Sequence, residues 1–600
     1  MNPDPSSPPP EFLRPDVLVV GGGFAGVLAA LAARAPGVTV CLVEPSNVLG
    51  GQGTAGGVAG FCGDSARVNR PFAELVRRLE RHGLIEPYRP NEDRRAYDLE
   101  WCAFFLQEMV CAAGIEVLLH SRVVAVHAAA GTVRTITVAT AGSLLQVAPR
   151  QVIDASGACV VAALGGFPFL HEGANRQLPM SLYFTLWDSG RKVTPVLPEG
   201  CPRWERDDEI PMTSIHCFPS GKVEVKMKVV GFDAADGRSR SAAEIFARRQ
   251  MHGLIHYLQT VGYRGRRLDT HVLAAVSRGI GVREERRIVG EHILTEAEAR
   301  RAVRFPDAVA VNTYHIDYHW PDRAQRAGTG ITDMLEPHHL PLRMMIPRGA
   351  RNLLVPGRGA SGDQMAMSAY RVMAVVAQMG FAAGLAARQA VERGVELGGL
   401  DLAALQAAII EGGQSLDLSD YGDYLRADRG GDEPVPGALP AALSLRQTRH
   451  SPFEVAWDEG ADRRCAHRIE RHWVPVPAAA ENAPAMAGAV LRLDDGTRLR
   501  VTAAAGALRA EFAGPGGVWS PGRTLGAADP AVTPAAVATR VGLAIVYADP
   551  VGGVRFWHGA PERLRGPLPE PAAVRLDAPP LEVRGTEADP AILPAAAGRA

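Results

Sequence analysis

The sequence lacks an excess of charge of either sign. Its 600 residues include 64 Lys and Arg against 65 Asp and Glu, which leaves a formal net charge of −1 at pH 7. Proteins that bind nucleic acid or anionic membrane surfaces usually carry a basic excess that supplies the attraction. We therefore expect neither nucleic acid nor a membrane as a partner.

Long apolar runs are also absent. No run approaches the roughly 20 residues that span a bilayer. The first sixteen residues, MNPDPSSPPPEFLRPD, lack the basic start and the apolar stretch of a secretory signal peptide. We expect a cytoplasmic protein whose residues 1–15 are disordered.

Cysteine is scarce, with 8 residues in the chain. No two of them form a CxxC or CxxxxC pair, and none stands at a zinc-site spacing with histidine. The missing CxxxxC pair argues against disulfide-reductase chemistry. His252 and His256 share a helix face but have no third ligand, so we expect no metal.

A β-α-β pattern is present near the amino terminus, in DVLVVGGGFAGVLAALAARAPGVTVCLVE. We expect a buried strand over Asp16–Val20, a helix over Val27–Ala35 and a second strand over Val38–Val43. The turn between strand and helix has the GxGxxG spacing of a dinucleotide site. A lone GxGxxG can be a mere connection, but here the flanking elements are in register with it.

The residues of this unit have separate roles in dinucleotide binding. Gly21 permits the sharp turn, Gly23 lets the backbone approach a pyrophosphate, and Gly26 lets the helix lie close to the strand. The helix N-terminus offers N–H groups to the phosphates. Glu44 ends the second strand, where a carboxylate can accept hydrogen bonds from a ribose. Together these residues predict a bound dinucleotide.

A second glycine-rich stretch, PSNVLGGQGTAGGVAGFCG, occupies residues 45–63. It is too poor in apolar residues for a strand or helix, and long loops in compact domains are usually functional. Its place after the ribose acid suits an extended cofactor, which favours FAD over NAD. Cys62 in this loop is interpreted as a small buried residue, with a redox thiol or a covalent flavin attachment as the alternative.

Hydrophobic periodicity predicts further elements along the chain. Helices are expected over 70–82, 98–113 and 242–261, and strands over 115–119, 123–126, 133–139, 144–147, 151–154, 181–188 and 222–230. A capping box is expected at Thr295–Glu298. After the glycine-rich segment 352–363, the small apolar residues of Met365–Arg393 predict one long core helix.

The carboxyl-terminal part differs in composition. Residues 401–425 read as a short helical segment, and Arg429–Leu443 as a Gly/Pro-rich linker. Asp495-Gly496 between two alternating runs predicts a hairpin over 490–501, with further strands over 541–547 and 554–557. We expect a small β module after residue 456.

Catalytic candidates alternate in Thr313–Trp320. If this segment is extended, His315, Asp317 and His319 share one face. An imidazole facing a flavin could remove a proton during alcohol or amine oxidation, oriented by the carboxylate. The alternative is a polar strand face that binds a neighbouring loop, and the residues do not decide between the two.

Three arginines compete as clamps for an anionic group: Arg283, Arg286 and Arg343. A guanidinium can hold a carboxylate with two hydrogen bonds. For Arg283 and Arg286 we favour solvated or interdomain salt bridges, and for Arg343 we favour a functional role.

The assembled motifs resemble the FAD-dependent oxidoreductase family of the glutathione-reductase-like two-dinucleotide superfamily, with tricarballylate-dehydrogenase and fumarate-reductase-like relatives. The resemblance covers about residues 16–415 and rests on the following segments: DVLVVGGGFAGVLAALAAR, LGGQGTAGG, VIDASG, REERRIVGEHILT, YHIDYH, LPLRMMIPRGARNLLVPGRGASGDQMAMSAYRVM and AQMGFAAGLAA.

The resemblance implies a set of FAD-binding residues. It places the ADP half on the turn and the ribose acid, the pyrophosphate and ribityl path along the second loop, the adenosine side at the third strand, and the flavin end at the last turn. In that order the residues are Gly21, Gly23, Phe24, Ala25, Gly26 and Glu44; Gly50, Gly51 and Thr54; Asp154 and Gly157; and Gly357, Arg358, Ser361 and Asp363. Where several relatives have Ala-Thr-Gly this chain has Ala155-Ser156-Gly157, which keeps the hydroxyl.

We predict an α/β protein with a Rossmann-like FAD-binding domain of three β/β/α layers, an inserted α+β substrate domain and a C-terminal all-β appendage. The expected boundaries are 16–172 and 341–400 for the FAD-binding domain, 173–340 for the substrate domain, 401–455 for the helical segment and linker, and 456–600 for the β module and tail.

The predicted activity is that of an FAD-dependent dehydrogenase or oxidase that moves a hydride between a small polar organic substrate and flavin N5. The catalytic residues would be His319, Asp317, His315 and Arg343. The absence of a second GxGxxG gives no support to a built-in NAD(P)H site, so the electron acceptor stays open, as does the oligomeric state. The alternatives are a flavin monooxygenase or another non-dehydrogenase flavoenzyme of secondary metabolism, and a binding protein that keeps a degenerate nucleotide fold.

Overall fold

The computed structural model describes residues 12–421, apart from 89–93, 218–221, 264, 326–329 and 334, and beyond 421 a set of strands and short segments between 433 and 593. The chain divides into two compact units. The first comprises 1–326, 334–424 and 590–600, and the second comprises 327–333 and 425–589.

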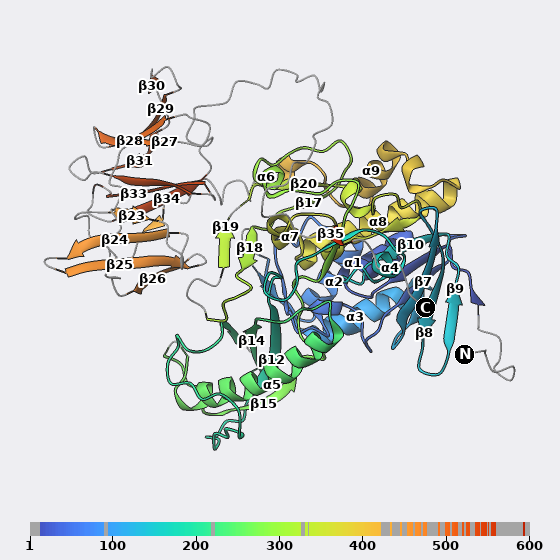
Figure 1. The fold of residues 1–600 in the computed structure, drawn as a ribbon, viewed down its shortest axis with the longest axis horizontal. Coiled ribbons are helices and arrows are strands. Elements are labelled where there is room, and N and C mark those ends of the chain that lie inside the picture. Colours follow the sequence, from blue (N-terminus) through green and yellow to red (C-terminus); the bar gives the residue numbers. More distant parts are fainter. Residues whose placement is uncertain are drawn as a thin grey trace. The chain divides into compact units, whose positions relative to one another are not determined.

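A five-stranded parallel sheet forms the centre of the first unit (Figure 1). In spatial order its strands are β21 (Leu353–Leu354), β10 (Gln151–Asp154), β2 (Val17–Val20), β3 (Val40–Val43) and β6 (Glu116–Leu118). All residues of β2, β3 and β10 are buried. A parallel sheet covered on both faces requires such continuous apolar strands, because neither face meets water.

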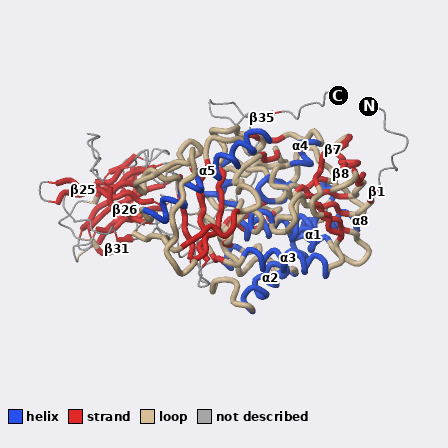
Figure 2. Tube along the Cα trace, turned by 90° about the horizontal axis from the view of Figure 1, so that it is seen from below, coloured by secondary structure: helices blue, strands red, loops and turns tan. Residues whose placement is uncertain are grey.

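Helices cover one face of this sheet and a small antiparallel sheet completes a third layer. The helices are α1 (Phe24–Ala33), α2 (Arg70–Arg81), α3 (Leu99–Ala112) and α8 (Met373–Arg393). The antiparallel sheet contains β7 (Arg122–Ala129), β8 (Thr132–Ala139) and β9 (Leu144–Val147), with β1 (Phe12–Leu13) added in parallel to β9. Figure 2 shows α1, α2 and α3 gathered on one side. The predicted three-layer FAD-binding fold is confirmed.

The predicted disorder of residues 1–15 can be compared with the structure only from residue 12 onward. Residues 1–11 lie outside the described residues, whereas Phe12 and Leu13 are held by β9. These two residues were predicted to be disordered, and their backbone pairing with Gln146 and Val147 shows that they are ordered.

A second sheet carries the predicted substrate layer. Its strands, in spatial order, are β13 (Thr213–Cys217), β14 (Lys222–Val229), β12 (Met180–Asp188) and β15 (His271–Val276), all antiparallel. Helix α5 (Gly237–Thr260) lies along one face (Figure 1), where apolar residues from Met180 to Val282 form a separate core. The segment after Ile288 instead packs into the core of the FAD-binding layers, which include Leu294 and Val309.

Shorter elements connect these layers. They are β4 (Gly60–Phe61), β5 (Arg95–Ala96), α4 (Val160–Leu164), β11 (Phe169–His171), β16 (Arg286–Ile288), α6 (Glu296–Arg300), β17 (Ala308–Asn312), β18 (Ile316–His319), β19 (Gly330–Asp333), β20 (His338–Pro341), α7 (Gln364–Tyr370), α9 (Leu402–Glu411) and β35 (Ile592–Leu593). Short 3-10 turns lie at Gly51–Gly53, Leu342–Met345, Gly357–Gly359, Leu397–Gly399 and Leu418–Tyr421. The predicted capping box at Thr295 and Glu298 opens α6.

The prediction of one helix over Met365–Arg393 is wrong. Two helices, α7 and α8, replace it and meet at an angle of 91°. The break falls at Arg371 and Val372, and Val372 has an extended backbone with ψ 152°. The Arg371 side chain binds both the carboxylate and the carbonyl of Asp317, so a contact distant in sequence accompanies the turn.

No single helix among the described residues is long and apolar enough to cross a membrane; the α7 and α8 pair reaches that length and composition only when both are counted together.

The second unit is built from antiparallel strands. They are β22 (Glu433–Pro434), β23 (Ser444–Arg446), β24 (Phe453–Glu459), β25 (Asp462–Ile469), β26 (His472–Val476), β27 (Val490–Arg492), β28 (Arg498–Ala504), β29 (Ala507–Ala513), β30 (Trp519–Ser520), β31 (Thr524–Ala527), β32 (Ala535–Thr539), β33 (Gly542–Ala548) and β34 (Val554–Gly559). Strands β27 and β28 form an antiparallel pair with Arg492 opposite Arg498, in the segment where the Asp-Gly hairpin is predicted. The turn residues 493–497 lie outside the described residues. Most of the predicted linker 429–443 lies outside the described residues.

Candidate active site

The turn after β2 has the backbone that a dinucleotide site needs. Gly21 has φ 98°, and a Cβ there would lie 2.6 Å from the carbonyl oxygen of Ala155. A Cβ on Gly26 would overlap the carbonyl of Gly21. Gly23 is different, because its nearest neighbour would be Gly51 Cα at 3.9 Å. The backbone is therefore tightly packed at Gly21 and Gly26 and open at Gly23, where the sequence predicts the pyrophosphate.

The loop over residues 45–63 lies against this turn. Gly50 donates a hydrogen bond from its N–H to the Gly22 carbonyl over 2.7 Å, and Gly50 and Gly51 have φ 105° and 55°. The Thr54 hydroxyl donates to the Leu49 carbonyl over 2.6 Å. Thr54 therefore holds the loop in shape, and its contact with a ribityl chain stays a prediction.

Glu44 is buried at the end of β3. Its Oε2 accepts a hydrogen bond from Gly22 N–H over 2.7 Å, and its Oε1 accepts one from Ser46 N–H over 2.8 Å. Each carboxylate oxygen has a second lone pair, so the carboxylate can organise the glycine turn and still accept from a ribose hydroxyl.

The turn after β10 is held by the buried Asp154 and the partly buried Arg358. Asp154 accepts from the backbone N–H groups of Val161 and Ala162, and so caps the start of α4. Arg358 donates from Nε to the Gly157 carbonyl over 2.9 Å and from Nη1 to the Val282 carbonyl over 2.6 Å. Both side chains thus join segments distant in sequence.

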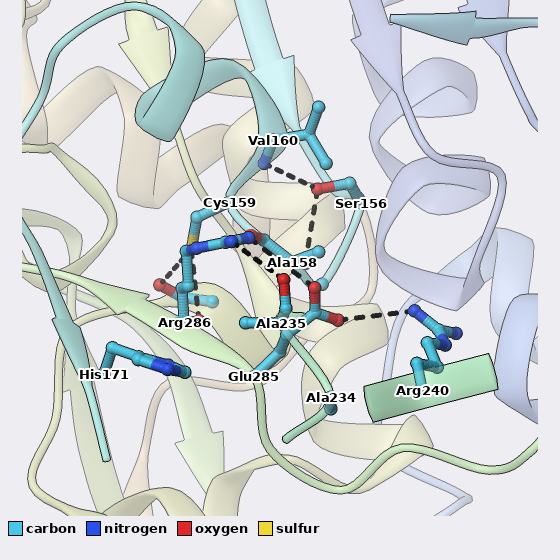
Figure 3. A network of polar contacts seen from close by, with 12 residues as sticks. Ser156, Ala158, Cys159, Val160, His171, Ala234, Ala235, Arg240, Glu285 and Arg286 are labelled. Atoms are coloured by element: carbon cyan, nitrogen blue, oxygen red, sulfur yellow. Dashed lines mark hydrogen bonds and ion pairs between the residues drawn. The ribbon is translucent and has the colours of Figure 1, made fainter. Parts of the chain in front are cut away.

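A wider polar network surrounds this turn (Figure 3). The Cys159 thiol lies 3.2 Å from the Arg286 carbonyl, and the carboxylate of Glu285 lies between Arg286 and Arg240, 3.7 and 3.8 Å away. Burial raises the pKa of Cys159 well above its usual range, as does Asp154. The thiol therefore stays protonated. Arg286 pairs with Glu285, which agrees with the salt bridge that the sequence analysis favoured for it.

In the last glycine-rich turn, the polar side chains also bind backbone N–H groups. Ser361 Oγ accepts from Gly290 N–H over 3.0 Å, and Asp363 accepts from Ala366 N–H and Glu296 N–H. Asp363 thereby caps α7. Gly357 has φ 83° and faces Ala25 at the start of α1, since a Cβ there would lie 3.3 Å from Ala25 Cβ.

Two helix N-termini converge on the glycine-rich loop. Neither α1 at Gly23 nor α8 at Val372 has a side-chain cap or an acidic residue in its first turn. Phe24 and Met373, the first residues of these helices, both lie where a Cβ on Gly53 would point. Uncapped N–H groups and open backbone are the donor set that suits a pyrophosphate and an anionic flavin edge, so these residues fit FAD.

A second cluster contains the predicted catalytic residues. His319 Nε2 lies 3.0 Å from Asp317 Oδ1, and Arg371 donates to Asp317 Oδ2 over 2.8 Å. The His315 ring lies against the Tyr314 ring, with centroids 4.0 Å apart and the planes tilted by 35°. Among the described residues, the buried atoms His319 Nδ1 and Arg371 Nε have no hydrogen-bond partner. Unpaired buried polar atoms are rare, and they commonly mark a place for a ligand or water.

Electrostatics sets the charge of this pair. Burial lowers the pKa of His319 to about 3, with Arg283 and Lys226 acting in the same direction and Asp317 against them. Burial raises the pKa of Asp317, but His319 and Arg371 outweigh it and hold the carboxyl well below its usual range. The carboxylate is ionised and accepts from Nε2–H, which leaves the Nδ1 lone pair of a neutral imidazole free.

The substrate-layer sheet presents a buried polar face. Alternate residues of β12 and β14 point away from the α5 core, among them Tyr183, Glu224 and Lys228. Arg94 connects Glu224, at 3.0 Å, to the Ala59 carbonyl of the glycine-rich loop, at 2.8 Å. Tyr183 lies against Gly57 of the same loop. The loop is thus placed between the dinucleotide turn and the polar face.

The structure does not bring Arg343 to this cluster. Its guanidinium pairs with Asp307, Nε to Oδ2 at 3.0 Å, and its side chain is 45% exposed. A half-exposed arginine already paired with a carboxylate is poorly suited to clamp a substrate. Arg283, which the sequence assigned to a structural salt bridge, lies near Asp317 and Arg371 instead, and each of them influences its pKa.

Sequence reasoning missed several residues of the cluster. Arg371 is the single charged residue between Asp363 and Arg388, in an otherwise apolar segment. In KVEVKMKVV every charge falls on one face of the strand. A buried strand with charges on one face, and an isolated arginine in a core segment, were the available signals.

The described residues contain no group of three or more His, Cys, Asp and Glu that could hold a metal ion. Cys62 is partly buried in the loop, and it influences the pKa of Tyr183.

A family model described as FAD dependent oxidoreductase matches residues 16–409. The chain therefore belongs to this family, and it is an FAD-dependent enzyme. No curated protein matches the sequence.

Solved structures provide more distant likenesses. The myxobacterial chondrochloren halogenase CndH is 14% identical, with a TM-score of 0.38 over 66% of this chain and 78% of that one. A geranylgeranyl bacteriochlorophyll reductase-like protein from Thermoplasma acidophilum is 13% identical, with a TM-score of 0.34 over 69% and 96%. The p-nitrophenol 4-monooxygenase PnpA from Pseudomonas putida is 12% identical, with a TM-score of 0.34 over 70% and 94%. No property of these proteins is transferred to this chain.

Proposed function

We propose that this enzyme is a dehydrogenase or oxidase that oxidises a small polar substrate at a carbon bearing a hydroxyl or amine group. The observation that carries the proposal is the state of His319. Its Nε2 is engaged by Asp317, while its buried Nδ1 has no partner among the described residues. A neutral imidazole with one oriented and one free nitrogen is the arrangement of a general base.

In an alcohol oxidation, His319, Asp317 and Arg371 would have separate roles. The substrate O–H bond breaks and its proton passes to His319 Nδ1, while the C–H bond breaks with both electrons and a C=O bond forms. Asp317 keeps Nε2 protonated and stabilises the imidazolium that results, as a carboxylate does behind a catalytic histidine. Arg371 holds the Asp317 carboxylate over 2.8 Å. When bound, FAD supplies the two-electron acceptor for the hydride.

The substitution His319→Asn tests this assignment. We expect the purified protein to stay yellow, because the dinucleotide turn is unchanged, and anaerobic reduction of the flavin by an active substrate to slow by about 10²- to 10⁴-fold. Stopped-flow absorbance would measure the rate. His292→Asn is the matched control, because His292 pairs with Glu298, at 3.3 Å, and not with Asp317. It should leave the rate unchanged.

Two outcomes would contradict the proposal. Flavin reduction at the normal rate in His319→Asn would show that His319 is not the general base. Reduction of the flavin by NADH or NADPH alone, with substrate conversion that requires oxygen, would favour the monooxygenase alternative.

A further inference from the structure

Arg283 differs from the other arginines near the proposed site in its partners. Its Nη1 donates to the Pro179 carbonyl and to Ser181 Oγ, each over 2.7 Å. Within the described part of the chain, no carboxylate oxygen lies within ion-pair distance of its guanidinium. By contrast, Arg371 pairs with Asp317 and Arg94 with Glu224.

Arg283 is partly buried, so a charge there without an opposite charge beside it is costly. The residue follows Gly281, which pairs with Ser181 of β12, and its surroundings include Arg371 and Asp317. Burial lowers its pKa, and Arg371 adds to the effect, while Tyr183 and Asp317 act in the opposite direction. A charge removed from water is normally compensated by an opposite charge and by hydrogen bonds.

Lys228 brings a second cation to the same place. Lys228 is buried, at 2% exposed, and it lies opposite Ser181 in the pairing of β14 with β12. Burial lowers its pKa to about 7, and the neighbouring Arg283 contributes to the shift. An anion bound to Arg283 would relieve this repulsion.

The geometry of the guanidinium suits a planar anion. Its hydrogen bonds to other described residues come from Nη1. The edge formed by Nε and Nη2 is the one that binds a carboxylate side-on with two parallel hydrogen bonds. The two Nη1 bonds, to Pro179 and to Ser181 of β12, fix the plane of the guanidinium and so orient that edge.

We propose that Arg283 binds a carboxylate group of the substrate, so that the enzyme acts on a small carboxylic acid that also carries the oxidisable hydroxyl or amine. This substrate class rests on the proposed function. His319 would act on the hydroxyl or amine, while Arg283 holds the acid end and sets specificity. A neutral alcohol or amine of the same size would leave the guanidinium without an opposite charge.

The test is calorimetric titration of the FAD-loaded, full-length protein with oxalate, and with the neutral analogue oxamide. We expect oxalate to bind and oxamide not to bind. In Arg283→Gln the affinity for oxalate should fall by about 30-fold or more, which is the usual scale for losing one partner of a buried charge pair. Arg283→Lys, which keeps the charge but loses the planar fork, should recover only part of the affinity.

Arg343→Gln is the matched control, because the half-exposed Arg343 already pairs with Asp307. It should bind oxalate as the unaltered protein does. The flavin spectrum of each variant shows that it has folded. Equal oxalate affinity in the unaltered protein and in Arg283→Gln would overturn the inference, as would failure of the unaltered protein to bind oxalate.

A binding measurement separates this inference from the proposed function. His319→Asn should still bind oxalate, because the acid end of the ligand does not need the base. If Arg283→Gln loses its affinity for oxalate while His319→Asn reduces its flavin at the normal rate, the carboxylate site is supported and the role of His319 as general base is refuted. If Arg283→Gln keeps its oxalate affinity while His319→Asn loses flavin reduction, the base stands and the carboxylate site does not.

Discussion

At the scale of single residues, burial controls the charge of the histidines. His216, His319 and His338 each have a pKa lowered to about 3, and burial is the largest cause for all three. Their imidazoles are neutral at physiological pH. For His319 this neutrality is what the proposed role as a base requires, whereas for His338 it has a consequence for stability.

His338 predicts a loss of stability in acid. Its side chain is 1% exposed, and its Nδ1 donates to the Glu336 carbonyl over 2.9 Å. Its pKa is near 6.5 in the unfolded chain and about 3 in the fold, so only the unfolded form takes up a proton between these values. The stabilisation is complete above pH 6.5 and is lost as the pH falls toward 3.

Thermal unfolding at pH 7.5 and pH 5 measures this effect. We expect the melting temperature to fall in acid, and His338→Gln to reduce the fall by the equivalent of about 2 kcal/mol at pH 5. His127→Gln, at an exposed position, should leave the fall unchanged. An equal fall in His338→Gln would refute the account.

At the scale of elements, the contact between α1 and α8 depends on two glycines. A Cβ on Gly380 would overlap the Ala25 carbonyl, and one on Gly384 would overlap the Ala29 carbonyl. The two helices therefore touch backbone to backbone. Because α1 starts at the dinucleotide turn, their spacing also positions that turn.

Gly384→Leu should force α1 and α8 apart. We expect a loss of about 1–3 kcal/mol or more, the usual cost of overpacking a core, together with weaker retention of FAD. Chemical denaturation and the flavin content of the purified protein would measure the two effects. Gly237→Ala is the control, because a Cβ at that helix residue meets no atom within 4 Å. Full stability and flavin content in Gly384→Leu would contradict the packing argument.

Local sequence could not predict the break between α7 and α8. Residues 365–393 are mostly small and apolar, and Arg371 is the one charged residue before Arg388. Such a composition favours an uninterrupted helix. The partner of Arg371 is Asp317, 54 residues earlier in the chain. An interaction at that distance leaves no trace in the periodicity of either segment.

At the scale of the whole molecule, the residues of the FAD site and of the polar cluster all belong to the first compact unit. The family match ends at residue 409. The unit also includes strand β35, which pairs with β11, but β11 keeps its other neighbour, β16, when β35 is removed.

A chain that ends after residue 424 should therefore still bind FAD. We expect the shortened protein to purify with the same flavin absorbance per chain as the full-length protein. The absorption spectrum before and after acid precipitation measures this, and also tells dissociable from covalent flavin. A colourless, folded product that takes up no added FAD would show that the second unit is needed.

The sequence by itself determined the β-α-β unit, its glycines and Glu44. These features depend on hydrophobic periodicity and on backbone freedom within about thirty residues, and both can be read from neighbouring positions. It also predicted that Asp317 and His319 share one face of an extended segment, because alternate residues of a strand do so; their ion pair was found in the structure.

Only the tertiary structure decided which arginines belong to the site. Arg343 pairs with Asp307 at the surface, while Arg371 and Arg283 come to Asp317 from other segments. The same holds for Asp154, Ser361 and Asp363, whose polar atoms bind backbone groups of other segments and helix starts. The function of a charged side chain depends on which partner satisfies it, and that partner is set by how distant segments pack together.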